Sequence, residues 1–340
     1  MNTKRKTTFL GLGLLLLAAI LWGFGFTTQD MALSSVGCFT LNVVRNIIAG
    51  LFLIPCIMFF DRKTDRRLFS KKQGKLHIDV RRAELIGGIL CGLALGTAST
   101  LQQFGIASET TDTGTAAFIT SLYMIFVPLL GLFRKKFPSV RIWLCVIAAL
   151  AGFYFLSANI TPDYSAGIGG FFVSLFRSGL RFHTSDILVL VCAVIFACHI
   201  VIIDAFLPYS DGVRLSCIQV FTAGIISIPF MLILEQPSFG QIMEVALPIL
   251  YLAIFSSGIA YTAQIVGQKY VDVAIASILL STESLFGALF GALFLNEQKN
   301  AIQLFGCLLV FSAVVISQLP ARQKNALPPV SAKDSDKKAN

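Results

Sequence analysis

The sequence predicts an all-α integral membrane protein with ten transmembrane helices, arranged as two inverted repeats of five helices each. Three observations lead to this fold class: the composition, a succession of apolar runs and a doubling of the sequence. Of the 340 residues, 56% are hydrophobic and 13% are charged, whereas an ordinary soluble domain has about 25% charged residues. With a mean hydropathy of +0.79, the chain has too few polar side chains to coat a water-soluble fold of this size.

Ten apolar runs follow one another along the chain, each of roughly the 20 residues that cross the hydrocarbon core of a bilayer. They cover, approximately, residues 8–28, 38–59, 84–104, 112–133, 138–157, 186–207, 213–234, 245–267, 273–295 and 300–319. The first run follows three basic residues, as the apolar segment of a signal peptide does. It is long, however, lacks an Ala-x-Ala cleavage site and leads into nine further runs, so we expect it to remain as the first helix.

The basic residues predict how these spans are oriented. If the N-terminus is cytoplasmic, all but four of the 27 Lys and Arg residues fall in cytoplasmic segments. The exceptions are Arg177, Arg181 and Lys299 outside, and Arg45 inside the second span. An excess of basic residues in short loops marks the cytoplasmic side, so we expect both termini in the cytoplasm. The basic segment 62–82 is also compatible with a patch for anionic lipids, but a solvated orientation signal is the favoured interpretation.

Charge and cysteine content argue against two other kinds of site. The net charge of +9 is spread between the apolar runs and does not gather on one face, as a nucleic-acid site requires. The eight Cys residues lie almost all inside apolar runs, without CxxC pairs or Cys/His clusters at metal spacing. We therefore expect no nucleic acid, no metal and no cofactor, and we interpret the cysteines as small packing residues.

The second half of the chain repeats the first. A shift of 162 residues aligns five identities within ten positions, namely Gly96 with Gly258, Ala98 with Ala260, Thr100 with Thr262, Gln102 with Gln264, and Gly105 with Gly267. A shift of 160 aligns residues 113–133 with 273–293, and a shift of 174 pairs Asp30 with Asp204. Because five spans is an odd number, the second copy enters the membrane from the opposite side. Two inverted halves can open a cavity between them to one face and then to the other, so this architecture favours alternating access.

Several of these runs resemble a known repeat. GTAAFITSLYMIFVPLLGLF from residue 114, followed by a basic turn and WLCVIAALAGFYFLS, resembles the EamA repeat of the drug/metabolite transporter superfamily. SDILVLVCAVIFACHIVIIDAF, ILLSTESLFGALFGALFLNEQ and LFGCLLVFSAVVIS are similar to the corresponding spans of a second copy. In the ninth span the family usually has Glu-Pro and then a stretch ending in Leu-x-Glu. Here Leu295 and Glu297 fit, but Ser284 follows Glu283 where the proline is usual, so the pattern gives no reason to expect a helix break there.

The resemblance implies a ten-helix transporter, mostly found in bacterial cytoplasmic membranes, that moves amino acids, other small metabolites or drugs, often outward and often with protons. It divides the chain into an N-terminal tail (1–11), a first repeat (12–157), an external linker (158–185), a second repeat (186–318) and a disordered cytoplasmic tail (319–340).

An acid inside the ninth span is the first candidate for the functional site. Glu283 lies ten residues into the span, which at about 1.5 Å per residue places it near the middle of a core about 30 Å thick. A charged carboxylate there costs roughly 2.5–3.5 kcal/mol on insertion scales, so such residues usually line a cavity or pair internally. We expect Glu283 to exchange the coupling proton or to contact a substrate amine. A protonated glutamate bonded between helices is the structural alternative.

The remaining candidates are polar or aromatic residues inside the spans. Arg45 in the second span and Asp30 at the end of the first are predicted to form a salt bridge at the outer mouth. Further substrate-site candidates are Gln102, Gln264, Tyr123, Tyr261, Trp22 and His199. For each of these, interhelical hydrogen bonding or aromatic packing is the structural alternative.

The sequence thus predicts a secondary active transporter of the bacterial plasma membrane, exporting a small, amino-acid-like metabolite by alternating access, with the proton as candidate coupling ion. A drug or lipid exporter and a metabolite importer remain alternatives within the class. A membrane enzyme or receptor is more remote, because the chain has no HExxH motif, no Walker loop and only three scattered His residues. A homodimer is a candidate assembly.

Overall fold

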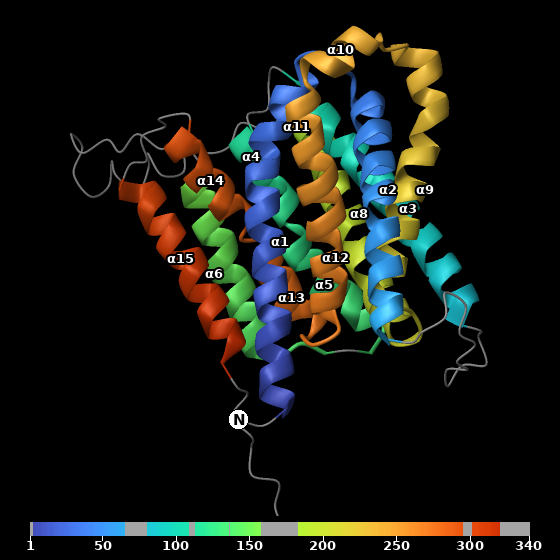
Figure 1. Ribbon diagram of the computed structural model, residues 1–340. Helices are drawn as coiled ribbons and strands as arrows, with labels where there is room; N and C mark the ends of the chain where they lie inside the picture. The colour runs from blue at the N-terminus through green and yellow to red at the C-terminus, as the bar shows by residue number, and fades with distance from the viewer. Residues whose placement is uncertain are drawn as a thin grey trace, which may run out of the picture.

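The computed structural model describes residues 3–64, 80–108, 113–135, 137–157, 183–294 and 301–319, and all regular structure within these ranges is helical (Figure 1). Eight helices are long and apolar enough to cross a membrane, and two shorter apolar helices, Val140–Phe155 and Ala301–Ser317, bring the number to ten. The predicted all-α membrane fold is confirmed. The linker 158–185 apart from its last residues, the tail beyond Leu319, and the residues Leu295, Glu297 and Lys299 lie outside the described ranges.

The spans of each repeat follow in chain order. The first repeat contains α1 (Thr3–Leu33), α2 (Cys38–Thr64), α3 (Val80–Ile106), the pair α4 (Thr113–Ser121) and α5 (Tyr123–Phe133), and α6 (Val140–Ser157). The second contains α8 (Thr184–Phe206) with the turn η1 (Leu207–Tyr209), α9 (Gly212–Phe230) with η2 (Met231–Glu235), α11 (Ala246–Tyr251) continued by η3 (Leu252–Ala260) and α12 (Tyr261–Gln268), the pair α13 (Val273–Leu280) and α14 (Glu283–Phe294), and α15 (Ala301–Gln318). The short helix α10 (Phe239–Glu244) lies at the end of the bundle opposite the N-terminus, which we call the far end.

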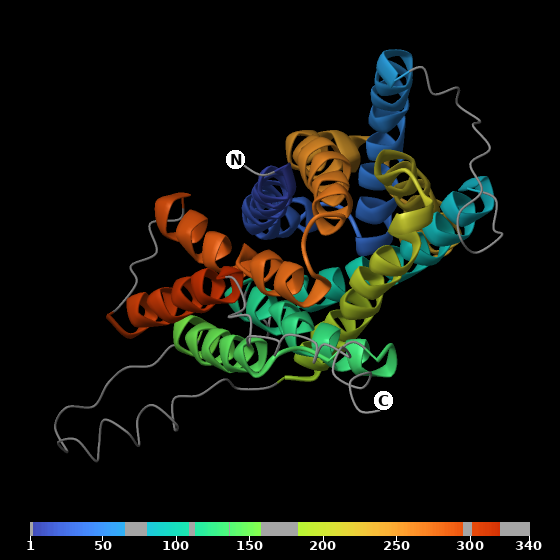
Figure 2. The ribbon, with the colours of Figure 1, turned by 90° about the horizontal axis from the view of Figure 1, so that it is seen from below.

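The two repeats are interwoven. Seen along the bundle, α3 packs against α8 and α9, and α1 packs against η3, α12 and α14, so helices of one repeat lie between helices of the other (Figure 2). The fifth spans of the two copies, α6 and α15, pack on each other, as do the second spans, α2 and α9. Each repeat therefore buries its apolar faces against the other copy.

The fourth and ninth spans are broken at equivalent positions and cross at their breaks. Ser121, at the end of α4, donates from its hydroxyl to the Ser281 carbonyl oxygen at 3.2 Å and contacts the Ser284 hydroxyl. The hydroxyl of Ser281 donates to Sδ of Met124 at 3.5 Å. Under the 160-residue shift, Ser121 corresponds to Ser281 and Met124 corresponds to Ser284. The Ser121–Ser284 and Ser281–Met124 contacts are therefore equivalent in the two repeats. The pseudo-two-fold axis of the inverted repeats therefore passes between Ser121 and Ser281.

Glycines allow the closest helix contacts. A Cβ atom at Gly92 of α3 would lie 2.5 Å from the carbonyl oxygen of Gln219 on α9, and Gly88 and Gly96 face the same helix. At Gly23 of α1 a Cβ atom would lie 2.9 Å from the Glu283 carbonyl oxygen on α14. Only glycine permits backbones to approach this closely, as expected for small-residue tracks in membrane helices.

Candidate functional site

A cavity of about 40 Å³ lies beside the crossing of the broken helices, with room for about three water molecules. Both repeats contribute to its wall. The lining residues are Trp22, Gly25, Phe26 and Gln29 of α1, Arg45 of α2, Gln102 of α3, Thr120 and Tyr123 of α4 and α5, Phe196, His199 and Ile200 of α8, Ser256, Tyr261 and Gln264 of η3 and α12, and Leu280 and Glu283 of α13 and α14. Every candidate from the sequence except Asp30 lines this cavity.

Equivalent positions of the two repeats line the same cavity. The pairs are Tyr123 with Glu283 under the 160-residue shift, Gln102 with Gln264 under the 162-residue shift, and Trp22 with Phe196 and Phe26 with Ile200 under the 174-residue shift. The cavity therefore shares the pseudo-symmetry of the fold, although the paired side chains differ in chemistry.

Glu283 is the first residue of α14, directly after the helix break. Its side chain is 5% exposed, and its Oε1 atom has no hydrogen-bond partner among the described residues. The break occurs without the family's usual proline, and hydroxyls of the two residues at the break donate to carbonyls of the last turn of α13. Ser281 donates to the Ile278 carbonyl at 2.8 Å and Thr282 to the Leu279 carbonyl at 2.6 Å. Inside a membrane, such side-chain bonds replace the water that would otherwise satisfy a broken helix.

Arg45 does not form the expected salt bridge with Asp30. Arg45 is 3% exposed and donates from Nη1 to Oε1 of Gln29 at 3.2 Å, whereas Asp30 is exposed. The reason is helical geometry: successive residues of α1 point about 100° apart, so when Gln29 faces α2, Asp30 faces away. The sequence analysis missed Gln29, although a second polar residue near the end of an apolar span was a usable signal.

Amide side chains of the first repeat form a network around Gln29. Gln102 and Gln103 of α3 both contact it, at 3.5 Å and 3.4 Å. Gln102 also donates from Nε2 to the Thr120 hydroxyl of α4 at 3.1 Å, and Gln103 donates to Oδ1 of Asn42 on α2 at 3.3 Å. Four helices of the first repeat are therefore tied together by hydrogen bonds on the far-end side of the cavity.

The second-repeat wall has fewer polar contacts. His199, fully buried, pairs through Nε2 with Oε1 of Gln219 at 3.0 Å, and Oε1 of Gln264 has no partner among the described residues. The Trp22 ring packs in a tilted arrangement against Tyr261, with ring centroids 4.8 Å apart, and its Nε1 atom donates to the Ser256 carbonyl oxygen at 3.1 Å. Ser256 lies in the π-helical segment η3, and π-helical turns are frequent at functional sites.

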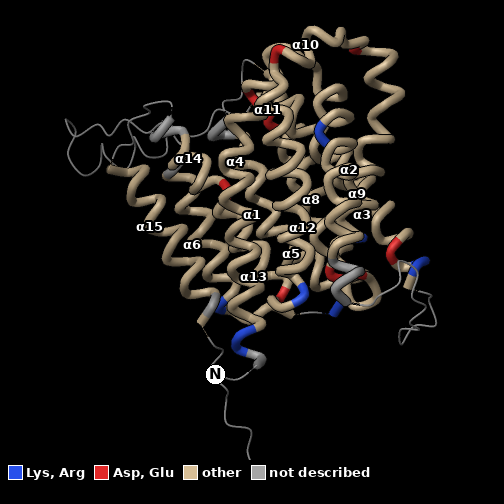
Figure 3. The backbone as a smooth tube through the Cα atoms, in the orientation of Figure 1, with Lys and Arg blue, Asp and Glu red and all other residues tan. Residues whose placement is uncertain are grey.

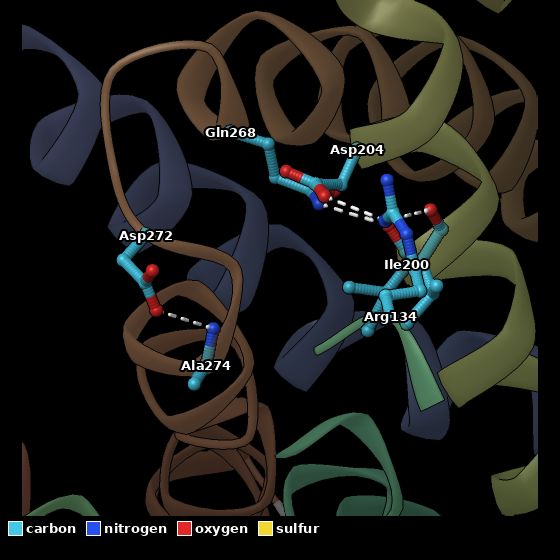
Figure 4. A network of polar contacts seen from close by, with 7 residues as sticks. Arg134, Ile200, Asp204, Gln268, Asp272 and Ala274 are labelled. Atoms are coloured by element: carbon cyan, nitrogen blue, oxygen red, sulfur yellow. Dashed lines mark hydrogen bonds and ion pairs between the residues drawn. The ribbon is translucent and has the colours of Figure 1, made fainter. Parts of the chain in front are cut away.

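Polar contacts also join helices at each end of the bundle. At the N-terminal end, Arg134 after α5 donates to Oδ2 of Asp204 on α8 at 2.8 Å, and Gln268 of α12 donates to the carbonyl of Ile200 at 3.2 Å (Figure 4). At the far end, Glu235 of η2 accepts from the backbone nitrogens of Phe39 and Thr40 at 2.9 Å and 2.7 Å, capping α2. The Arg134 and Glu235 contacts join one repeat to the other, whereas the Gln268 contact lies within the second repeat.

The described residues contain no group of three or more His, Cys, Asp or Glu placed to hold a metal ion. None of the eight cysteines forms a disulfide bond.

Comparison with known proteins identifies the family. The EamA-like transporter family matches residues 9–158 and 183–318. A protein from Archaeoglobus fulgidus, named as an uncharacterized transporter, is 30% identical over 94% of this chain and 88% of its own length. Another of the same name, from Methanothermobacter thermautotrophicus, is 23% identical over 88% of this chain and 83% of its own length. One solved crystal structure, 16% identical, has the same fold, with a TM-score of 0.69 over 95% of this chain and 99% of its own. The chain belongs to the EamA-like transporter family of the drug/metabolite transporter superfamily, and it is a multi-pass membrane transporter.

Proposed function

We propose that this transporter exports a small, amino-acid-like metabolite across the bacterial plasma membrane by alternating access, and that Glu283 exchanges the coupling proton. The observation that carries the proposal is the position of Glu283. It is a buried carboxyl group in a cavity beside the pseudo-two-fold axis, and it lies at the first turn of a broken helix. In inverted-repeat transporters, such breaks near the axis are where substrate and coupling ions bind.

The symmetry supports the alternating-access part of the proposal. An inverted repeat permits two conformations in which the halves exchange their shapes, so the polar contacts at the two ends can break in turn. The crossing at Ser121 and Ser281 stays fixed, because it lies on the axis. The cavity beside it then opens to one face at a time.

The charge distribution supports the orientation. Lys and Arg residues of the described ranges gather at the N-terminal end of the bundle (Figure 3). Arg45, buried in α2, is an exception. By the positive-inside rule this end is cytoplasmic. Export is then movement from the N-terminal end to the far end.

The neighbours of Glu283 support the proton rather than a metal cation. The titratable groups that face it are the phenols of Tyr123 on α5 and Tyr261 on α12 and the thiol of Cys192 on α8. All three are neutral in their ordinary state near pH 7, so no second carboxylate is present among them to complete a cation cage. Glu283 can therefore alternate between its charged and neutral forms without an ionic partner.

The test is flux in proteoliposomes containing the full chain. Labelled amino acids, nucleosides, sugars and lipophilic cations are loaded in turn, and efflux is measured with and without a pH gradient. We expect one metabolite class to move faster with the gradient, and Glu283→Gln to exchange that substrate without responding to the gradient. Glu244→Gln is the matched control, because Glu244 is exposed on α10. Full gradient-driven flux in Glu283→Gln overturns the coupling role, and flux of lipophilic cations alone supports the drug-exporter alternative.

A further inference from the structure

Arg45 is a buried cation without a counter-ion. Of its three guanidinium nitrogens, Nη1 alone makes a hydrogen bond, to the neutral side chain of Gln29, and Nε is buried with no partner. Among the residues that the structure describes, no carboxylate forms an ion pair with it. An arginine inside a membrane protein normally pairs with an acid or with backbone carbonyls, because an unpaired charge in that environment is costly.

Glu283 does not supply the missing charge. Both residues line the cavity, but Oε1 of Glu283 is unpartnered and the two side chains make no contact. Tyr261 also lines the cavity and is close enough to both residues to interact with each of them. The cavity wall therefore has a positive site on α2 and, separately from it, a carboxyl group on α14.

The repeat shows that the fold does not require a cation at this place. Asn42 of α2 donates to the Thr100 hydroxyl at 2.7 Å, and in the second repeat Thr262 donates to the Ser216 hydroxyl at 2.8 Å. These equivalent bonds set α2 and α9 in register, with Asn42 matching Ser216. Three residues further on, Arg45 then matches Gln219, a neutral side chain. The positive charge belongs to one half of the cavity only, which is expected of a ligand-binding group more than of a packing group.

We infer that Arg45 binds the carboxylate of the transported molecule, and that the site takes small organic carboxylates, with amino acids as the class that also satisfies Glu283. This inference rests on the proposed function and names its substrate class. The Nε–Nη2 edge of the guanidinium is unengaged, and this edge presents two parallel donors that match a carboxylate. The ammonium group of an amino acid then reaches toward Glu283 past Tyr261. A phosphate dianion fits less well, because Arg45 is the only cation among the lining residues.

The experiment measures ligand-induced thermal stabilisation of the purified full chain. The probes are L-alanine, L-leucine and L-phenylalanine, each beside its decarboxylated amine and its deaminated acid, together with inorganic phosphate. The variants are Arg45→Gln, which installs the residue found at the equivalent position of the second repeat, Arg45→Lys, and the control Arg82→Gln, which removes an exposed charge at the start of α3.

We expect at least one amino acid and its deaminated acid to stabilise the wild type and Arg82→Gln, and the matching amine to have no effect. Binding by Arg45→Gln is expected to be on the order of 10- to 100-fold weaker, since a hydrogen bond to a charged group is lost. The affinity of Arg45→Lys should fall between those of the wild type and Arg45→Gln, because lysine keeps the positive charge but lacks the two parallel N–H donors of a guanidinium group. Without ligand, Arg45→Gln should melt no lower than the wild type.

Four outcomes overturn the inference. Three concern the ligands: carboxylates stabilise Arg45→Gln as much as the wild type, amines or phosphate alone stabilise the wild type, or no probe stabilises it. The fourth is a large loss of ligand-free stability in Arg45→Gln while Arg45→Lys binds carboxylates as the wild type does. Flux measurements distinguish failure of this inference from failure of the proposed function. If carboxylates bind through Arg45 but never cross the liposome membrane, the transport proposal is refuted and the binding site is retained. If neutral or cationic metabolites cross and Arg45→Gln does not change their flux, the carboxylate site is refuted and the transport proposal is retained.

Discussion

The two halves of the cavity wall come from equivalent helices but differ in their chemistry. The first repeat supplies a hydrogen-bonded amide network around Gln29, with the Arg45 cation at its edge. The second repeat supplies the pair His199–Gln219 and the Glu283 carboxyl group, with little else bonded between them. The backbone symmetry that allows alternation is thus kept, whereas the side chains that would recognise a ligand are not repeated.

This difference separates two requirements within one molecule. Alternation needs contacts that are interchangeable between the halves, and these lie on the axis at Ser121 and Ser281. Recognition needs a ligand to lie in one orientation, and an asymmetric wall provides that. Substitutions on the axis should therefore affect all ligands alike, whereas substitutions in the wall should discriminate between ligands.

The largest effect is expected where the two repeats pack unequally. Gly92 brings α3 against α9, but its equivalent in the second repeat under the 162-residue shift is Ile254. In Gly92→Leu, the new side chain meets the backbone oxygen of Gln219, which cannot move alone, so we expect a destabilisation of about 3 kcal/mol or more. Loss of the thermal unfolding transition in detergent measures it. Ile254→Leu is the control, with an expected change below about 1.5 kcal/mol, and equal melting of the two variants would contradict the packing asymmetry.

The next effect concerns the equivalent pair Tyr123 and Glu283. The Tyr123 hydroxyl is buried next to the Glu283 carboxyl group but makes no hydrogen bond of ordinary geometry, so Tyr123→Phe should change the free energy of unfolding by less than about 1 kcal/mol. We expect this variant to keep gradient-driven flux, unlike Glu283→Gln. Parallel flux assays at equal internal and external pH, and with a gradient, check the contrast. Loss of the gradient response in both variants would mean that the pair acts as one unit.

A smaller difference is expected between the equivalent glutamines. Gln102 accepts from Gln29 and donates to Thr120, whereas Oε1 of Gln264 is unpartnered. Gln102→Ala should therefore lower the free energy of unfolding by about 1 kcal/mol, and Gln264→Ala should leave it nearly unchanged. Both are expected to weaken apparent substrate affinity in counterflow. Unchanged affinity in both variants would show that neither glutamine binds the substrate, and that the hydrogen bonds of Gln102 are structural only.

The sequence predicts the fold well because membrane architecture depends on properties that it encodes directly. Apolar runs give the spans, and the odd number of spans in the repeat gives the inversion. The break before Glu283 was not predicted, because it depends on the local bonds of Ser281 and Thr282 and has no proline to mark it.

Eight of the nine candidate residues line the cavity, whereas the contacts between them could not be derived from the sequence. Polar side chains are rare in the spans, so those from separate helices were expected to share one cavity. The partner of Arg45 was misassigned, because only the rotation of α1 decides whether Gln29 or Asp30 faces α2. The boundary of that span was known to within a few residues, and an error of one residue turns the helix by about 100°.

The smallest effect is expected at the N-terminal end of the bundle. The Arg134–Asp204 pair joins α5 to α8, but the Arg134 side chain is 36% exposed, so its contribution is of the order of a surface ion pair, about 0.5 kcal/mol. Arg134→Gln should shift the balance toward opening at this end by about twofold.

Water access to Trp22 measures that shift, because Trp22 lines the cavity and Trp143→Phe removes the other tryptophan of the chain. In the Trp143→Phe background, acrylamide quenching should be stronger with Arg134→Gln than with the exposed control Arg82→Gln. High salt should abolish the difference, since a solvent-exposed pair is screened. A difference that persists at high salt would mean that Arg134 acts through its bond to the Val201 carbonyl oxygen instead, and that α5 is tied to the backbone of α8 rather than to its charge.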